Sequence, residues 1–110
     1  MELKEGYLPI SSRSVVQGTI DCSSAAPAIA TDARQALFIA LTNPSKQNVE
    51  YAIYNDSVGK VVASGTLTSG NSTSVIVKAQ DNPNIVRIQN QSPCDASGVT
   101  PQLTYAASTQ

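Results

Sequence analysis

The sequence predicts an all-β fold, an antiparallel two-sheet β-sandwich or jelly roll of about seven to eight strands with an extended N-terminal arm. Two observations predict it. Short stretches of alternating apolar and polar residues are separated, about every twelve residues, by clusters of Gly, Pro, Asn, Asp and Ser, and no stretch of useful length has a helical period. The chain has 110 residues, the size of one domain with its own core. We divide it into an arm at 1–13, a β-sandwich domain at 14–106 and a C-terminal tail at 107–110.

The arm is the first element. Residues 1–13 include Pro9 and four charged residues and alternate poorly, which is typical of an extended segment. The apolar residues of the arm are Leu3, Tyr7, Leu8 and Ile10. Because main-chain hydrogen bonds and apolar side chains let such a segment add a strand to an open sheet edge, we expect these residues to contact a neighbouring subunit.

Seven strands follow the arm. We expect them at 14–20, 36–42, 48–54, 60–67, 73–79, 84–90 and 100–106. Short turn sequences separate the four strands between residues 36 and 79, which predicts an antiparallel meander with one buried face. Gly18 inside the first strand indicates a bulge or a close approach of the backbone. Pro101 cannot donate a ladder hydrogen bond, so it belongs at the start of the last strand or at a sheet edge.

The middle strands are more apolar on their second face than contact with solvent requires. The residues expected there are Phe38, Ala40, Ala52, Tyr54, Val62 and Ile76. Either packing within the sandwich covers them on both sides, or they contact another subunit. We expect Phe38 and Tyr54, together with the arm, to form an interface.

Cys22 and Cys94 flank this central region. Two cysteines in a chain without histidine cannot complete a four-ligand zinc site. Both lie in stretches of Ser, Pro and Asp, which favours a disulfide over the alternative of two free buried thiols. A disulfide across a loop of this length stabilises a fold by roughly 4 kcal/mol and indicates an oxidising environment.

The composition argues against several kinds of partner. Charged residues make up 14%, the net charge is −1 and the seven basic residues are scattered, so we expect no nucleic-acid partner. No apolar run reaches the roughly 20 residues of a membrane-spanning helix, so we expect no membrane partner. The first twenty residues lack the apolar segment of a signal peptide. We expect either a chain that is used without this export route or one whose signal has been replaced by an initiator Met.

The sequence offers no catalytic set. A nucleophilic Ser or Thr needs a neighbouring base, usually His, and the chain has no His. The carboxylates Glu50, Asp56, Asp81 and Asp95 are isolated from one another in sequence, and three of them lie where turns recruit Asp. We predict that the chain is not an enzyme and holds no cofactor or metal.

These features favour a structural protein that packs against copies of itself or against a larger protein lattice. We expect a small virion component, such as a phage-like capsid decoration or minor coat protein. The alternative is a secreted carbohydrate-binding or pilin-like adhesive β-sandwich module, so the expected location is a virion or the extracellular space. The segment 16–22 resembles the first strand of fimbrial subunits, which implies the adhesive alternative. Carbohydrate binding by a sandwich typically uses an aromatic platform, for which Tyr54 is the candidate.

Overall fold

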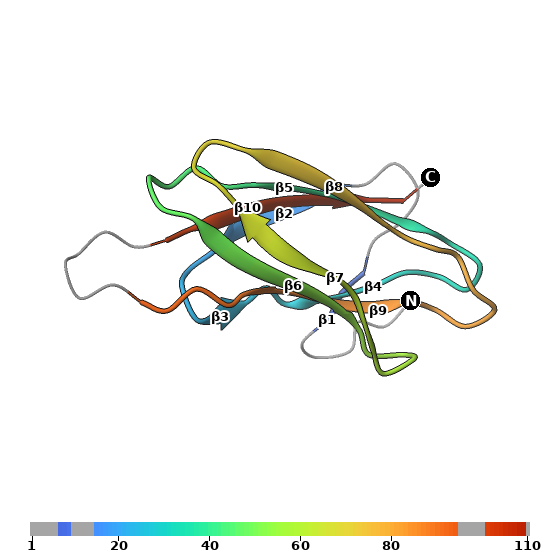
Figure 1. The fold of residues 1–110 in the computed structure, drawn as a ribbon. Helices are drawn as coiled ribbons and strands as arrows, with labels where there is room; N and C mark the ends of the chain where they lie inside the picture. Colours follow the sequence, from blue (N-terminus) through green and yellow to red (C-terminus); the bar gives the residue numbers. More distant parts are fainter. Residues whose placement is uncertain (1–6, 10–14, 95–100, 110) are drawn as a thin grey trace.

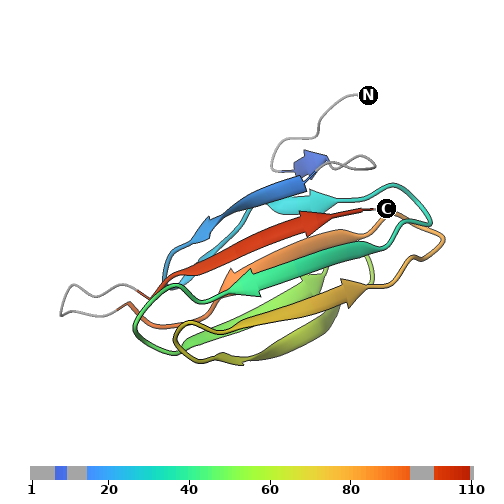
Figure 2. The same ribbon diagram turned by 90° about the horizontal axis from the view of Figure 1, so that it is seen from above.

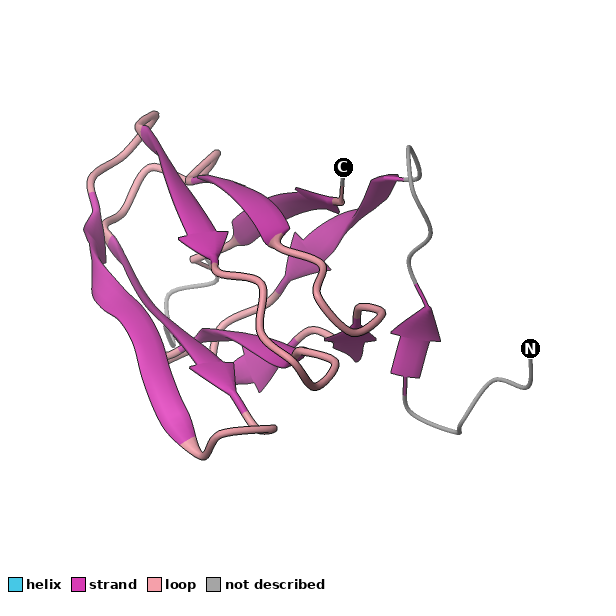
Figure 3. Ribbon diagram, turned by 90° about the vertical axis from the view of Figure 1, so that its right-hand side faces the viewer, coloured by secondary structure: helices cyan, strands magenta, loops and turns pink. Residues whose placement is uncertain are grey.

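The computed structural model describes residues 7–9, 15–94 and 101–109, which form two β-sheets packed face to face (Figure 1). Every regular element in these ranges is a strand (Figure 3). The predicted all-β sandwich is therefore confirmed. Most of the predicted arm, including Leu3 and Ile10, lies outside the described residues.

The larger sheet has six strands. They are β1 (Tyr7–Pro9), β3 (Ser24–Ala25), β4 (Ala28–Ala30), β6 (Val49–Asn55), β7 (Lys60–Leu67) and β9 (Ile85–Asn90). Five of these strands follow the order β1-β4-β9-β6-β7, and β3 also pairs with β9. The pairs are antiparallel except for β1, which runs parallel to β4. Residues 7–9 of the arm thus complete a sheet of their own chain.

The smaller sheet has four strands in the order β2-β10-β5-β8, and Figure 2 shows them side by side. They are β2 (Val15–Ile20), β5 (Leu37–Thr42), β8 (Ser72–Val77) and β10 (Leu103–Ser108). All three pairs are antiparallel. The seven predicted strands correspond to β2 and to β5 through β10, with ends that differ by at most three residues. The last strand runs past its expected end, so Ala107 and Ser108, which we placed in the tail, belong to β10. Ala107 is fully buried in the core.

The predicted meander between residues 36 and 79 is wrong. β5 pairs with β10 and β8, whereas β6 pairs with β7 and β9, so only β6 and β7 form a hairpin. The connections before β6 and after β7 each cross from one sheet to the other. Asn43 directly follows β5 and stabilises both crossings, since its side-chain amide donates to the carbonyls of Gln47 (2.6 Å) and Leu67 (2.9 Å). Turn residues show where a chain reverses but not which sheet receives the next strand.

The core lies between the inner faces of the two sheets. Its fully buried aliphatic side chains are Ile29, Leu37, Leu41, Val49, Ile53, Val86, Ile88 and Leu103. Each sheet also has a tyrosine directly opposite a glycine, Tyr105 opposite Gly18 and Tyr51 opposite Gly65. A Cβ added at Gly18 would lie 3.1 Å from the Tyr105 hydroxyl oxygen, so the ring covers this glycine. The close approach predicted at Gly18 therefore comes from the Tyr105 side chain.

Candidate functional site

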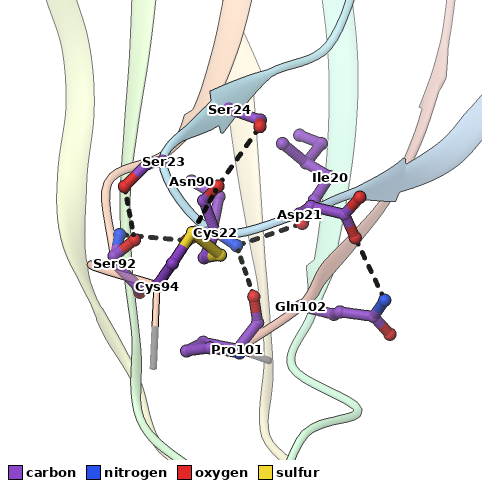
Figure 4. The surroundings of a disulfide bond; sticks show 10 residues. All are labelled: Ile20, Asp21, Cys22, Ser23, Ser24, Asn90, Ser92, Cys94, Pro101 and Gln102. Carbon is purple, nitrogen blue, oxygen red and sulfur yellow. Dashed lines mark hydrogen bonds between the residues drawn. A yellow bond between two sulfur atoms is a disulfide. The ribbon is translucent and has the colours of Figure 1, made fainter. Parts of the chain in front are cut away.

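The disulfide joins the two sheets at one end of the sandwich. Cys22 follows β2 of the smaller sheet and Cys94 follows β9 of the larger sheet, and their Cα atoms lie 5.1 Å apart (Figure 4). The predicted bond between Cys22 and Cys94 is thus present, and the alternative of free thiols is excluded.

Hydrogen bonds from Asn90 and Ser92 close the same end (Figure 4). The buried amide of Asn90 donates to the carbonyls of Ile20 and Pro101, both at 3.0 Å. Its oxygen accepts from the Ser92 N–H at 3.1 Å, and the Ser92 hydroxyl oxygen accepts from the Glu50 N–H at 2.8 Å. This amide therefore links a strand of one sheet to the start and end of strands in the other. This role was not predictable from the sequence, since Asn and Ser at the end of a strand are typical of exposed turns.

The outward side chains of the smaller sheet form a surface without charge. They stand in three cross-strand rows, which follow from the register of the four strands. The rows are Val15–Ser108–Phe38–Ile76, Gln17–Ala106–Ala40–Ser74 and Thr19–Thr104–Thr42–Ser72. None of these residues is charged. We call this surface the neutral face.

The neutral face has a hollow at its centre. Ala40 and Ala106 lie opposite each other on β5 and β10, and their short side chains leave a depression of about 400 Å³. Hydroxyl and amide groups surround the two methyl groups, and these belong to Gln17, Thr19, Thr42 and Thr104. The volume falls within the usual range for small-molecule sites, about 300–1,000 Å³.

Hydrogen bonds order one side of this hollow. The Thr104 hydroxyl donates to the Thr42 carbonyl at 3.2 Å, and the hydroxyl oxygens of Thr42 and Ser72 lie 3.0 Å apart. The side chains of Gln17 and Thr19 are exposed. Neither has a hydrogen-bond partner within the part of the chain that the structure describes. The hollow thus combines two fixed hydroxyl groups with two polar side chains that can turn toward a ligand.

The outward face of the larger sheet carries a charged cluster around Tyr54. The guanidinium of Arg87 lies 4.8 Å from the centre of the Tyr54 ring and forms an ion pair with Asp56 at 2.7 Å. The hydrogen bond to Asp56 raises the pKa of Arg87. Gln91 donates to the Tyr54 hydroxyl at 3.0 Å. Tyr54 is half-buried and already stacked, so it does not present the open aromatic platform that the carbohydrate-binding alternative would use.

The expected interface residues do not gather on one surface. Phe38 lies on the neutral face, whereas Tyr54 lies on the outward face of the opposite sheet. Tyr7 and Leu8 belong to β1, which pairs with β4 of the same chain instead of a neighbour's edge. Ala52, which we placed on the outer face of its strand, is buried there, as coverage within the sandwich would predict. An interface made by the arm with Phe38 and Tyr54 remains a prediction.

The segment Ser57-Val58-Gly59-Lys60 has the Ser-x-x-Lys spacing of some acyl-transfer enzymes, so the expectation that the chain lacks such a motif is wrong. It forms the turn between β6 and β7, where Gly59 has a φ of +65°. The Ser57 hydroxyl donates to the Asn55 oxygen at 2.8 Å and accepts from Gln80 at 2.7 Å. Both contacts fix the loop, so the turn accounts for this serine.

The described ranges contain neither a cluster of metal ligands nor a membrane-spanning helix. In residues 7–9, 15–94 and 101–109, no three His, Cys, Asp or Glu side chains come together as metal ligands would. The same ranges contain no helix of the length and hydropathy needed to cross a bilayer.

The fold resembles a known domain over its full length. The chain matches the pre-peptidase C-terminal domain of a collagenase from Bacillus anthracis, solved at 1.0 Å, with a TM-score of 0.60 and 13% sequence identity. The match covers 100% of both chains. No family model matches the sequence. No curated protein matches it either.

This likeness corrects the function that we predicted from the sequence. The fold is that of an accessory domain of a protease, so the predicted virion component is wrong. The sequence could not separate the two, because low charge and an uncharged polar surface are shared by capsid proteins and by extracellular modules. The likeness is to the C-terminal domain of a collagenase, and the expectation that the chain is not an enzyme stays a prediction.

Proposed function

We propose that this chain is a secreted, non-catalytic module that acts by binding an extracellular polymer. The observation that carries the proposal is the neutral face with its central hollow. This face presents uncharged side chains that a ligand could contact, and the residues of its three rows include no catalytic group. The full-length resemblance to an accessory domain of a collagenase supports the same class of protein.

The disulfide supports an extracellular location. Disulfides persist in oxidising compartments and are rare where glutathione keeps thiols reduced. Cys22 and Cys94 form the covalent link between the sheets, so the fold gains most where this bond stays oxidised. The low proportion of charged residues, 14%, is also common in extracellular modules.

A binding panel tests the proposal. The oxidised chain would be incubated with insoluble cellulose, chitin and starch and with soluble dextran, mannan, alginate and gelatin, and binding would be measured by co-sedimentation or affinity electrophoresis. We expect saturable binding to at least one polymer. The heat-denatured, reduced chain is the control for non-specific adsorption. If the folded chain binds none of these polymers better than this control, the proposal is wrong.

A further inference from the structure

We propose that the hollow of the neutral face binds an extended, uncharged glycan chain. This inference rests on the proposed function, since it names the ligand class and the site of that binding module. The ligand would lie across β2, β10 and β5, over Ala40 and Ala106.

Charge is the first argument. An acidic polysaccharide or a phosphorylated partner would gain from cationic side chains, and none of the twelve residues of the neutral face supplies one. The charged residue that follows Thr19 on the same side of β2 is Asp21, and its carboxylate accepts from the Gln102 amide at 3.1 Å. A ligand without charge can therefore replace its hydration with hydrogen bonds to the hydroxyl and amide groups of this surface, whereas an ionic ligand would give up hydration without an oppositely charged partner among the twelve residues.

The mixture of groups in the hollow is the second argument. A sugar ring presents C–H groups and hydroxyls that both donate and accept hydrogen bonds. The methyl groups of Ala40 and Ala106 suit the C–H groups, and the hydroxyl and amide groups of Gln17 and Thr19 donate and accept as a sugar does. Phe38 stands two positions from Ala40 on the same side of β5, outside the residues that line the hollow, and offers an aromatic group farther along the same face.

The size of the surface is the third argument. Four strands about 4.8 Å apart and three rows about 6.8 Å apart make a face of about 20 Å by 20 Å, or about 400 Å². A stable protein–protein interface buries about 800 Å² on each partner. The neutral face alone is therefore too small for a second copy of the chain, but it is long enough for several sugar units in a row.

Substitutions at the hollow test the inference, with the soluble neutral polysaccharides dextran, mannan and hydroxyethyl cellulose as probes. Ala40→Gln fills the hollow from an exposed position without adding charge, and Ser64→Gln places the same side chain on the outward face of the larger sheet. Gln17→Ala removes a polar group from the hollow, and Gln89→Ala makes the same change on β9 of the larger sheet. Thermal unfolding would establish that each variant is folded.

We expect the original chain to bind at least one neutral probe with an affinity that does not change between about 0.05 M and about 0.5 M salt. Ala40→Gln should weaken that binding at least tenfold and Gln17→Ala about fivefold, while both control variants bind as the original chain does. If Ala40→Gln does not fold, the binding of Gln17→Ala alone decides whether the hollow is the site.

The other outcomes separate this inference from the proposed function. Binding of a neutral probe that Ala40→Gln and Gln17→Ala leave unchanged overturns the hollow as the site but keeps the binding module. Binding to alginate or gelatin alone overturns the neutral glycan as the ligand class. Failure of the folded chain to bind any polymer overturns both proposals.

Discussion

The outward faces of the two sheets differ in charge, although the sheets are built alike on their inner faces. Both sheets bury aliphatic side chains, and each packs one tyrosine over one glycine. Outside, the larger sheet carries Arg87, Asp56 and Glu50, whereas the smaller sheet carries only uncharged side chains in its three rows. Since the core does not require this difference, it points to separate roles for the two surfaces.

We call the outward face of the larger sheet, around Tyr54, the charged face. The charged side chains beside Tyr54 already contact other residues of the same chain. Arg87 stacks on Tyr54 and pairs with Asp56, and Gln91 holds the Tyr54 hydroxyl. On the neutral face, the side chain of Gln17 has no such contact within the described residues. The apolar side chains of Val15 and Ile76 are 60% and 58% exposed. A surface that keeps some polar side chains without partners beside exposed apolar groups can gain from a ligand.

The largest effect should come from removing the covalent link between the two sheets. We expect Cys22→Ser with Cys94→Ser to lower the free energy of unfolding by about 4 kcal/mol, because the sequence separation is 72 residues. Chemical denaturation of the oxidised chain and the double variant measures this difference. A loss below about 1 kcal/mol would show that the core and the hydrogen bonds hold the sheets together with little help from the disulfide.

The next effect concerns the polar link between the sheets at the same end. Asn90→Ala leaves the carbonyls of Ile20 and Pro101 without their donor, so we expect a loss of about 3 kcal/mol. The control is Asn71→Ala at an exposed loop position, which should cost less than about 0.5 kcal/mol. Equal effects in the two variants would contradict the role assigned to Asn90.

A smaller effect should come from the two glycines that face a tyrosine on the inner faces of the sheets. Gly18→Ala places a methyl group 3.1 to 3.3 Å from the Tyr105 ring, which is buried and cannot move aside, so we expect a loss of about 1–2 kcal/mol. Gly65→Ala meets Tyr51, which is only half-buried and can shift, so its effect should be smaller. Urea unfolding of both variants gives the order. If Gly65→Ala proves the more costly, the packing of the two tyrosines has been misjudged.

A pH effect should belong to the smaller sheet. Burial raises the pKa of Tyr105, so the folded state holds its phenolic proton more firmly than the unfolded state, whose pKa is about 10. The contribution of Tyr105 to the free energy of unfolding is complete below about pH 10. It is lost as the pH rises through the higher pKa of the folded state, and the free energy then falls by at most about 1.4 kcal/mol per pH unit. Unfolding of Tyr105→Phe should lack this component of the alkaline loss. An identical alkaline profile in the two proteins would contradict it.

The smallest effect should come from the charged face. Arg87 and Asp56 are 37% and 42% exposed, and such pairs contribute about 0.2–1 kcal/mol. Asp56→Asn should therefore lower stability by less than about 1 kcal/mol, and the difference should shrink in about 0.5 M salt. Denaturation at two salt concentrations measures it. A loss above about 2 kcal/mol would mean that the Tyr54 cluster is a structural element of the fold.

The alternation of residues predicted the strands well but not their partners. Stretches such as 60–67 are recognisable because side chains two positions apart share a face. The pairing is not recognisable, since the turns before β6 and after β7 look like hairpin turns and yet change sheets. The short strands β3 and β4 were missed because Pro27 lies between them and they are only two and three residues long, too short to show an alternating pattern.

The candidate site was missed for the same reason. Each residue of the hollow is unremarkable in its own strand, and Thr19 and Thr104 become neighbours only through the pairing of β2 with β10. Tyr54 was a reasonable candidate on type and position, but Arg87, which covers its ring, comes from β9. The disulfide was predictable because two cysteines allow one pairing only.

The most direct test of the difference between the two faces is a titration of the isotope-labelled chain with a fragment of a neutral polysaccharide that it binds, followed by amide chemical shifts. We expect the largest changes at Ala40, Thr42, Thr104 and Ala106, around the hollow. Largest changes at Tyr54, Arg87 and Gln91 instead would place binding on the charged face and contradict the account.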